Sequence, residues 1–415
     1  MTTTKNNEHK KLNFSSEREQ SQACLNSAEH EKNQGRKVLN VPNLRFPEFQ
    51  GEWEYFLIND VCSEFKSGKN IKADSVFECG EYPVYGGNGL RGYTSSYNHE
   101  GSYVLIGRQG ALCGNVRSVY GKTYITEHAI AVAGNEKSNT NFLHYLFLKM
   151  NLGQYSDQSA QPGLAVNKLL KLKVALPVIS EQTKIAKLLS LLDERIATQN
   201  KIIDKLQSLI KGLNDSLYTQ HGGEVLTSFA NLGTSYSGLS GKSAQDFGSG
   251  KPFITYLNVY SNNVINENDF QYVAIKDGEK QNVVEYGDIL FTLSSETPEE
   301  VGIGSVYLGK EKVYLNSFCF GIHITNTEVA FPPYLSYYVS LTAFRKFIYP
   351  YAQGSTRFNL CKADFEKASI KLPTLENQKR IYSVLEHIDC KIETERQMLN
   401  LYNSQKEYLL RQMFI

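Results

Sequence analysis

Two segments of the chain, 196 residues apart, repeat one pattern. Residues 176–199 read LPVISEQTKIAKLLSLLDERIATQ, and residues 372–395 read LPTLENQKRIYSVLEHIDCKIETE. In each segment a Leu-Pro pair and a polar start precede apolar residues that recur in alternating steps of four and three. This is the a/d spacing of a coiled coil. The pattern predicts two long helices, one in the middle of the chain and one at its end.

A lone amphipathic helix must bury its apolar stripe, and these two matched stripes are suitable partners. Both stripes are interrupted by a polar residue at the equivalent position, Gln199 and Glu395. We therefore expect the helices to pair antiparallel as a coiled coil. The residues expected at the pairing surface are apolar: Ile185, Leu189, Leu192, Ile196, Ile381, Leu385, Ile388 and Ile392.

The repeat predicts an α+β fold with pseudo-two-fold internal symmetry. Each half contains a globular domain, a twisted β-sheet with helices, followed by a long helix. Residues 1–40 are polar and charged without a sustained period, which predicts a disordered tail or an extension from a start codon assigned upstream of the true one. The expected divisions are residues 1–40, 41–178 (first globular domain), 179–220 (central helix), 221–373 (second globular domain) and 374–415 (C-terminal helix).

Short apolar runs bounded by glycine predict the strands of the globular domains. These strands are expected at residues 82–85, 102–106 and 129–133, and at residues 253–259, 288–293 and 318–324. Two helices of related sequence are predicted at residues 141–152 and 333–347.

Composition limits the class of protein. An apolar content of 41%, with 26 Tyr and 21 Phe, excludes a chain that is disordered throughout. The seven cysteines are odd in number and lack a Cys-x-x-Cys pair, which excludes the usual zinc spacings and fits a reducing cytosol. The sequence lacks a membrane-length apolar run and a signal-peptide core. We expect a cytoplasmic protein without a metal site.

Two glycine motifs suggest nucleotide chemistry but lack parts that it requires. Residues 87–92 match the dinucleotide fingerprint, yet a strand or loop follows instead of a helix, and the acidic residue about twenty positions on is missing. Residues 240–243 resemble the end of a phosphate-binding loop, but Tyr236 stands where its first glycine is needed. A loop that lets backbone approach a ligand closely is the better interpretation of the first motif.

A third motif, residues 331–334, is similar to the target-amine motif of amino-methyltransferases. Phe331 replaces the amide or acid that would bind the amine, so we expect the two prolines to begin a helix instead. We find no recognisable catalytic constellation. His128, His144 and His323 are expected to be partly buried core residues rather than ligands.

Local charge is more informative than the net charge of +1. Basic residues exceed acidic ones in residues 82–126 and again, at a related place, in residues 337–371. A turn in the first patch displays Arg108 and Gln109, whose forked side chains fit the edges of guanine and adenine, respectively. A merely solvated turn is the alternative.

The order of these pieces resembles the specificity (S) subunit of Type I restriction–modification systems, especially members from low-GC Gram-positive bacteria. The residues that carry the resemblance are 41–49 (VPNLRFPEF), 51–54 (GEWE), 83–89 (PVYGGNG), 104–108 (VLIGR), 287–291 (GDILF) and 352–357 (AQGSTR). One departure is Thr255, since the family often has an arginine in the corresponding strand.

The resemblance implies that each globular domain is a target-recognition domain that contacts one half of a bipartite double-stranded DNA site. The paired helices would serve as a ruler and as the docking surface for two methyltransferase (M) subunits, which restriction (R) subunits would join. No cofactor is expected on this chain. S-adenosylmethionine, ATP and Mg would be bound by the partner subunits, and this chain alone should neither methylate nor cleave DNA.

The residues expected to bind DNA lie on glycine-flanked or polar turns and strand ends. They are Gly87, Asn88, Arg91, Tyr93, Arg108, Gln109, Lys242, Tyr256, Asn258, Ser294, Ser355, Thr356 and Arg357.

Two other functions stay open at this point. A stand-alone DNA methyltransferase or nuclease with its own recognition domain would bind labelled S-adenosylmethionine as a purified chain. A coiled-coil scaffold without a role on DNA would show no salt-sensitive retention on DNA.

Overall fold

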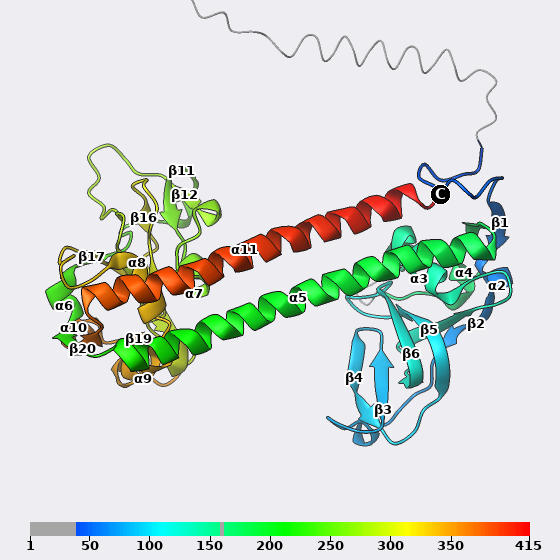
Figure 1. The fold of residues 1–415 in the computed structure, drawn as a ribbon, viewed down its shortest axis with the longest axis horizontal. Coiled ribbons are helices and arrows are strands. Elements are labelled where there is room, and N and C mark those ends of the chain that lie inside the picture. The colour runs from blue at the N-terminus through cyan, green and yellow to red at the C-terminus, as the bar shows by residue number, and fades with distance from the viewer. Residues whose placement is uncertain (1–38, 158–161) are drawn as a thin grey trace, which may run out of the picture. The chain divides into compact units, whose positions relative to one another are not determined.

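The computed structural model describes residues 39–157 and 162–415 (Figure 1). The predicted disordered tail, residues 1–40, lies almost wholly outside the described residues. The chain forms two compact units, one reaching to Glu194 and including Asn403–Ile415, the other comprising Arg195–Tyr402. Each unit therefore contains one globular domain and a part of each long helix.

A six-stranded sheet forms the centre of the first unit, in the order β2-β7-β5-β6-β3-β4. Neighbouring strands are antiparallel except for β3 and β6, which are parallel. The strands are β2 (Cys62–Ser67), β3 (Tyr82–Gly86), β4 (Gly89–Thr94), β5 (His99–Gly107), β6 (Val116–Ile125) and β7 (Ala129–Gly134). The three strands predicted in this domain are thus confirmed, in β3, β5 and β7.

Helix α3 (Thr140–Met150) packs on β5, β6 and β7 and confirms the helix predicted there. The Asn139 side chain caps it, because its oxygen accepts the backbone N–H groups of Asn141 and Phe142. Residues 129–132 of β7 and residues 104–107 at the end of β5 are runs of consecutive buried residues, as burial on both faces requires. The remaining elements of the domain are α2 (Ile58–Val61), α4 (Val166–Leu169) and the antiparallel pair β1 (Glu54–Leu57) and β8 (Lys173–Leu176).

The second unit is built from several small sheets around an aromatic core. Phe229, Phe291 and Phe365 are fully buried, and their ring centroids lie 5.1 to 5.4 Å apart. The sheets are β10-β17-β13-β15, β12-β11-β16, β14-β19-β18 and β20-β9. Their strands are β9 (Val225–Thr227), β10 (Gly233–Ser237), β11 (Phe247–Ile254), β12 (Gln271–Val273), β13 (Ile289–Thr292), β14 (Ser294–Ser295), β15 (Gly304–Val306), β16 (Tyr314–Leu315), β17 (Cys319–Ile324), β18 (Ala352–Gln353), β19 (Phe358–Leu360) and β20 (Ile370–Leu372).

The strands predicted at residues 288–293 and 318–324 are confirmed in β13 and β17, but the strand predicted at residues 253–259 is wrong in its second half. Strand β11 ends at Ile254, and helix α7 (Tyr256–Ser261) follows at once. The cause is Thr255, whose hydroxyl accepts the backbone N–H of Asn258 and caps the helix.

The helix predicted at residues 333–347 is two helices, α8 (Pro332–Tyr338) and α9 (Thr342–Ile348), because Leu341, with φ −57° and ψ 140°, is not helical. The predicted role of the two prolines is confirmed, since they begin α8. Helices α6 (Phe229–Leu232) and α10 (Lys362–Lys367) complete this domain.

The two predicted long helices are confirmed as α5 (Ile179–His221) and α11 (Leu375–Gln412). A buried glutamine in the first turn fixes the start of each. Gln182 Nε2 donates to the carbonyls of Pro177 (2.8 Å) and Lys137 (2.9 Å), and its Oε1 accepts the N–H of Asn139 (2.8 Å). The same amide therefore ties α5 to the start of α3.

Gln378 makes the equivalent three bonds in the second unit. Its Nε2 donates to the carbonyls of Pro373 (2.9 Å) and Val329 (2.8 Å), and its Oε1 accepts the N–H of Phe331 (2.8 Å). Farther along the helices, Tyr145 donates to Asp193 and Tyr337 donates to Asp389. The internal repeat thus extends from the helix pattern to the hydrogen bonds that attach each helix to its domain.

Within the second unit, α5 and α11 run antiparallel, as predicted (Figure 1). Gln199 Nε2 donates to the Glu395 carbonyl oxygen (3.1 Å) and to its carboxylate. Farther along, Ile381 and Leu385 share one buried core with Ile210, Leu213 and Leu217. The remaining predicted pairing residues are also shielded from solvent: Ile185, Leu189, Leu192 and Ile392 are buried, and Ile196 and Ile388 are half-buried.

We expect replacement of Ile392 by aspartate to destabilise the second unit. Ile392 is 5% exposed, and an unpaired carboxylate at such a position costs roughly 3–5 kcal/mol. Thermal unfolding followed by far-ultraviolet circular dichroism measures this loss of stability. The matched control is Leu401→Asp on the same helix, because Leu401 is 68% exposed. Equal melting temperatures for the two variants would show that Ile392 is not packed.

We expect His144 to make the first unit sensitive to acid. Burial lowers the pKa of His144 to about 4, with Lys406 adding to the effect and Asp193 opposing it. The unfolded imidazole has a pKa near 6.5, so its stabilising contribution is complete above about pH 6.5 and is lost as the pH falls toward 4.

Between pH 7 and pH 4.5 the protonation of His144 should lower the free energy of unfolding by roughly 2–3 kcal/mol. The His144→Phe variant should lack this decrease, as measured by urea unfolding at both pH values. His387→Phe is the control, because His387 is exposed. An unchanged pH dependence in His144→Phe would contradict the assignment.

Candidate nucleic-acid interface

Three turns of the first unit meet at the end of its sheet. They are the turn between β3 and β4, the turn between β5 and β6, and residues 127–128 before β7. Glycine makes this approach possible: a Cβ on Gly87 would lie 2.7 Å from the His128 carbonyl oxygen, and one on Gly107 would lie 2.9 Å from the Gly87 carbonyl oxygen. The backbone N–H of Arg108 donates to the His128 carbonyl (2.9 Å). The turns therefore form one rigid backbone frame.

This frame surrounds an open polar pocket of about 260 Å³, lined by Gly86, Gly87, Asn88, Arg91, Gln109 and His128. The structure thus brings together four residues that the sequence predicts to bind DNA. Asn88, Arg91 and Gln109 are exposed, so their donors and acceptors are accessible to a ligand. Behind the β3–β4 turn, the guanidinium of Arg117 approaches Gly89 so closely that a Cβ there would lie 3.3 Å from Nη1.

Two predicted residues of this domain do not line the pocket. Arg108 belongs to the same turn as Gln109, and its side chain is half-buried. Tyr93 lies on β4 and exchanges two backbone hydrogen bonds with Phe77, both of 2.8 Å.

His128 is the residue that sequence reasoning missed, and its prediction as a partly buried core residue is wrong. Its side chain is 46% exposed and lines the pocket. Its Nδ1 lies 3.2 Å from Gln109 Oε1, and its Nε2 lies 3.1 Å from Glu127 Oε1. Its position in a polar turn next to a strand is the feature of the sequence that could have indicated an exposed side chain. His144 and His323 are partly buried, as predicted.

In the second unit, Ser355, Thr356 and Arg357 are exposed on the turn between β18 and β19. The Arg357 guanidinium carbon lies 5.8 Å from the ring centroid of Phe318, which is itself 54% exposed. A Cβ on Gly354 would lie 2.1 Å from the Arg357 carbonyl oxygen, so this tight turn requires glycine. The turn presents an arginine and two hydroxyl groups to solvent.

Tyr256 and Ser294 hold the strands behind this turn in place and do not belong to its exposed surface. The Tyr256 hydroxyl donates to the Ser294 carbonyl (2.8 Å), and β14, which contains Ser294, pairs with β19. The Ser294 residue is only 5% exposed.

The structure also corrects the prediction for Lys242 and Asn258. The Lys242 side chain is 6% exposed and pairs with Glu279, and this contact lowers the pKa of Glu279 to about 2. The Asn258 amide is buried and exchanges hydrogen bonds with the backbone of Asn266. Both side chains are occupied inside the domain by partners that the sequence pattern does not show, Glu279 at 37 residues from Lys242 and Asn266 at 8 residues from Asn258.

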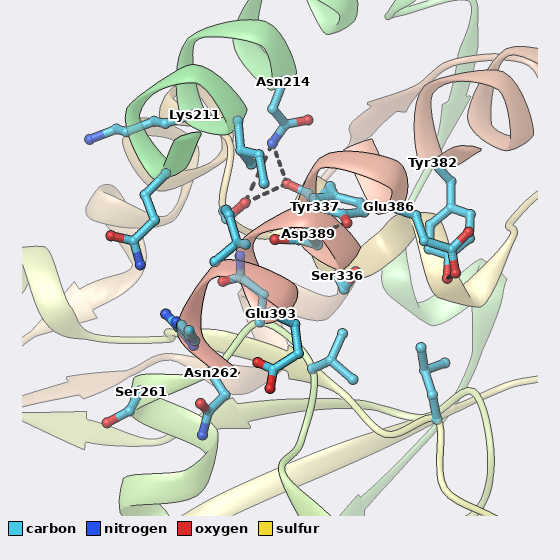
Figure 2. A pocket seen from close by; sticks show the side chains of 18 residues that line it. Lys211, Asn214, Ser261, Asn262, Ser336, Tyr337, Tyr382, Glu386, Asp389 and Glu393 are labelled. Atoms are coloured by element: carbon cyan, nitrogen blue, oxygen red, sulfur yellow. Dashed lines mark hydrogen bonds between the residues drawn. The ribbon is translucent and has the colours of Figure 1, made fainter. Parts of the chain in front are cut away.

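The second unit also contains a larger groove, of about 680 Å³, between α5, α8, α11 and the loop at residues 261–264 (Figure 2). Its α11 side carries Glu386, Asp389 and Glu393, and burial raises the pKa of Asp389. Arg396 on the same helix and Lys211 on α5 also line the groove, so its lining carries charges of both signs.

Residues 39–157 and 162–415 contain no group of three or more His, Cys, Asp or Glu side chains that could hold a metal ion. In the same residues no helix is long and apolar enough to cross a membrane.

Comparison with known proteins agrees with this geometry. Residues 50–208 and 240–401 both match the family described as Type I restriction modification DNA specificity domain. The Type I restriction enzyme EcoprrI specificity subunit of Escherichia coli is 42% identical over 154 residues, which are 36% of this chain and 38% of that protein. A putative Type I restriction enzyme specificity subunit of Haemophilus influenzae is 23% identical over 379 residues, 86% of this chain and 93% of its own length.

The fold has solved counterparts. The S subunit of a Type I restriction–modification system from M. genitalium has a TM-score of 0.59 at 14% identity, covering 90% of this chain and 99% of that chain. These relatives are named specificity subunits, not methyltransferases or nucleases, so neither alternative function is supported. The two matched regions together cover most of the sequence, and the chain belongs to the Type I restriction–modification DNA specificity family.

Proposed function

We propose that this chain reads a bipartite DNA target, with each unit contacting one half-site. The observation that carries the proposal is the pocket of the first unit, where Asn88, Arg91 and Gln109 converge on an open, glycine-lined frame. Arginine donates two hydrogen bonds to guanine, and the amides of asparagine and glutamine fit adenine, so this set can read base edges in the major groove.

The exposed turn at residues 354–357 is the corresponding surface in the second unit. Arg357 provides the forked donor, and the hydroxyl groups of Ser355 and Thr356 can contact base edges or phosphates. The two surfaces differ in sequence and in backbone geometry, which supports different base sequences for the two half-sites.

The proposal places catalysis on partner subunits. Two methyltransferase subunits would dock on the helices and bind S-adenosylmethionine, and restriction subunits would join this core and use ATP and Mg. Some apolar side chains on the helices in the second unit are exposed and would be available to such a partner. They are Leu209, Val384, Met398 and Leu401. The complex would act on DNA in the cytoplasm.

Substitution of one arginine in each unit tests the half-site assignment. Arg91→Ala should relax sequence preference in one half-site only, and Arg357→Ala in the other, because each lost bidentate contact is worth roughly 1–3 kcal/mol. The measurement is genome-wide mapping of methylated bases in a host that expresses the variant with its methyltransferase subunit.

The control is Tyr120→Ala, a residue of the first unit that is 86% exposed and does not line the pocket. Equal weakening on specific and random DNA would make either arginine a phosphate contact. A wild-type complex without a bipartite preference would overturn the proposed function itself.

The long helices provide a second test, of their role as a ruler. A seven-residue helical insertion between Ile203 and Ile210, together with one between Leu385 and Ile392, preserves the heptad phase in both helices. Each insertion adds about 10 Å, or roughly three base pairs. Methylome mapping should show unchanged half-sites separated by a longer gap.

An insertion in α5 alone is the control for the pairing. It should disrupt the antiparallel helices and reduce methylation at every site. A double insertion that methylates normally with the original gap would show that the helices do not set the spacing.

A further inference from the structure

His128 lies between two hydrogen-bond acceptors. Its Nε2 faces the Glu127 carboxylate (3.1 Å), and its Nδ1 faces the side-chain oxygen of Gln109 (3.2 Å). An amide oxygen only accepts hydrogen bonds, so the contact with Gln109 Oε1 is made by a ring whose Nδ1 carries a proton and donates it.

This contact decides which end of the Gln109 amide is available. Oε1 is held by the His128 ring, which leaves the amide NH₂ group as the part of Gln109 that can meet a ligand. The same pocket contains the guanidinium of Arg91, which is also purely a donor. With Gln109 in this orientation, two neighbouring side chains offer donors.

We propose that His128 is a positioning residue, which holds the Gln109 amide so that the pocket selects a guanine in the half-site read by the first unit. The inference rests on the proposed function and deepens it. Guanine presents two acceptors, N7 and O6, in the major groove, whereas adenine presents one acceptor and one amino donor. The two donors from Arg91 and Gln109 satisfy guanine and leave the amino group of adenine facing another donor, which is costly.

The glycine frame makes this selection rigid. The backbone of residues 107–109 is held by the bond from Arg108 N–H to the His128 carbonyl and by the bridge between Gln109 and Gly163. Because the backbone of His128 and Gln109 is fixed, the remaining freedom of Gln109 is that of its side-chain torsions, and the contact with His128 Nδ1 restrains them.

The proposal predicts opposite effects for two substitutions of His128. His128→Lys retains a permanent donor beside Gln109 and should preserve the guanine preference. His128→Asp supplies a permanent acceptor, so the amide should turn its NH₂ group toward residue 128 and present Oε1 to DNA. The preference at one base pair should then change from guanine to a base that presents an amino group, adenine or cytosine.

The experiment uses the full chain in complex with its methyltransferase subunits. Binding is measured for duplexes in which each base pair of both half-sites is changed in turn. We expect the wild-type and His128→Lys complexes to prefer guanine at one position of the first unit's half-site by roughly ten- to a hundredfold. His128→Asp should reverse that preference, and Gln109→Ala should abolish it, with the other half-site unchanged.

Tyr120→Asp is the matched control for an added carboxylate on the exposed surface of the same unit, and it should leave base preferences unaltered. A His128→Asp complex that keeps the wild-type guanine preference, or that weakens binding equally to all duplexes, would overturn the role of His128. Either result leaves the proposed function intact, because the wild-type complex still reads two half-sites. A wild-type complex that reads no guanine through Gln109 would also overturn this inference alone.

Discussion

The buried amides of Gln182 and Gln378 are the interaction on which the architecture depends. Each is fully buried and makes three hydrogen bonds, to the proline two residues before its helix and to both sides of the loop that starts a domain helix. Loss of one such amide would leave a buried N–H and two carbonyl groups unsatisfied. Each glutamine therefore fixes the direction in which a long helix leaves its own domain, and the repetition of the bonds explains why the helix pattern repeats so closely.

The long helices could be predicted from sequence because their stability depends on a periodic apolar stripe. The predicted central helix, residues 179–220, differs from α5 by one residue at its C-terminal end. Strand prediction failed after Ile254, because a run of apolar and aromatic residues fits both a strand and a helix. The deciding contact there is a single hydroxyl, that of Thr255, which caps α7. The small sheets of the second unit depend on pairings between distant residues, which no local pattern indicates.

The candidate interface was predictable where local geometry determines it. Glycine-rich turns must lie at strand ends, so the convergence of Gly87, Asn88, Arg91 and Gln109 agrees with the sequence prediction. The role of Lys242 could not be read in this way, because its partner Glu279 is 37 residues away. A single histidine likewise belongs to no repeating sequence pattern, and only the structure shows that His128 contacts Gln109.

The polar pair in the middle of the helices is unequal, since a glutamine on one helix meets a glutamate on the other. Suppose that two copies of the C-terminal half associated through the same helix surface: two Glu395 carboxylates would then face each other in a largely buried position, and like charges repel there. The mixed pair instead joins a donor to an acceptor. This single asymmetry therefore favours pairing between the two different halves of one chain over self-association of the C-terminal half.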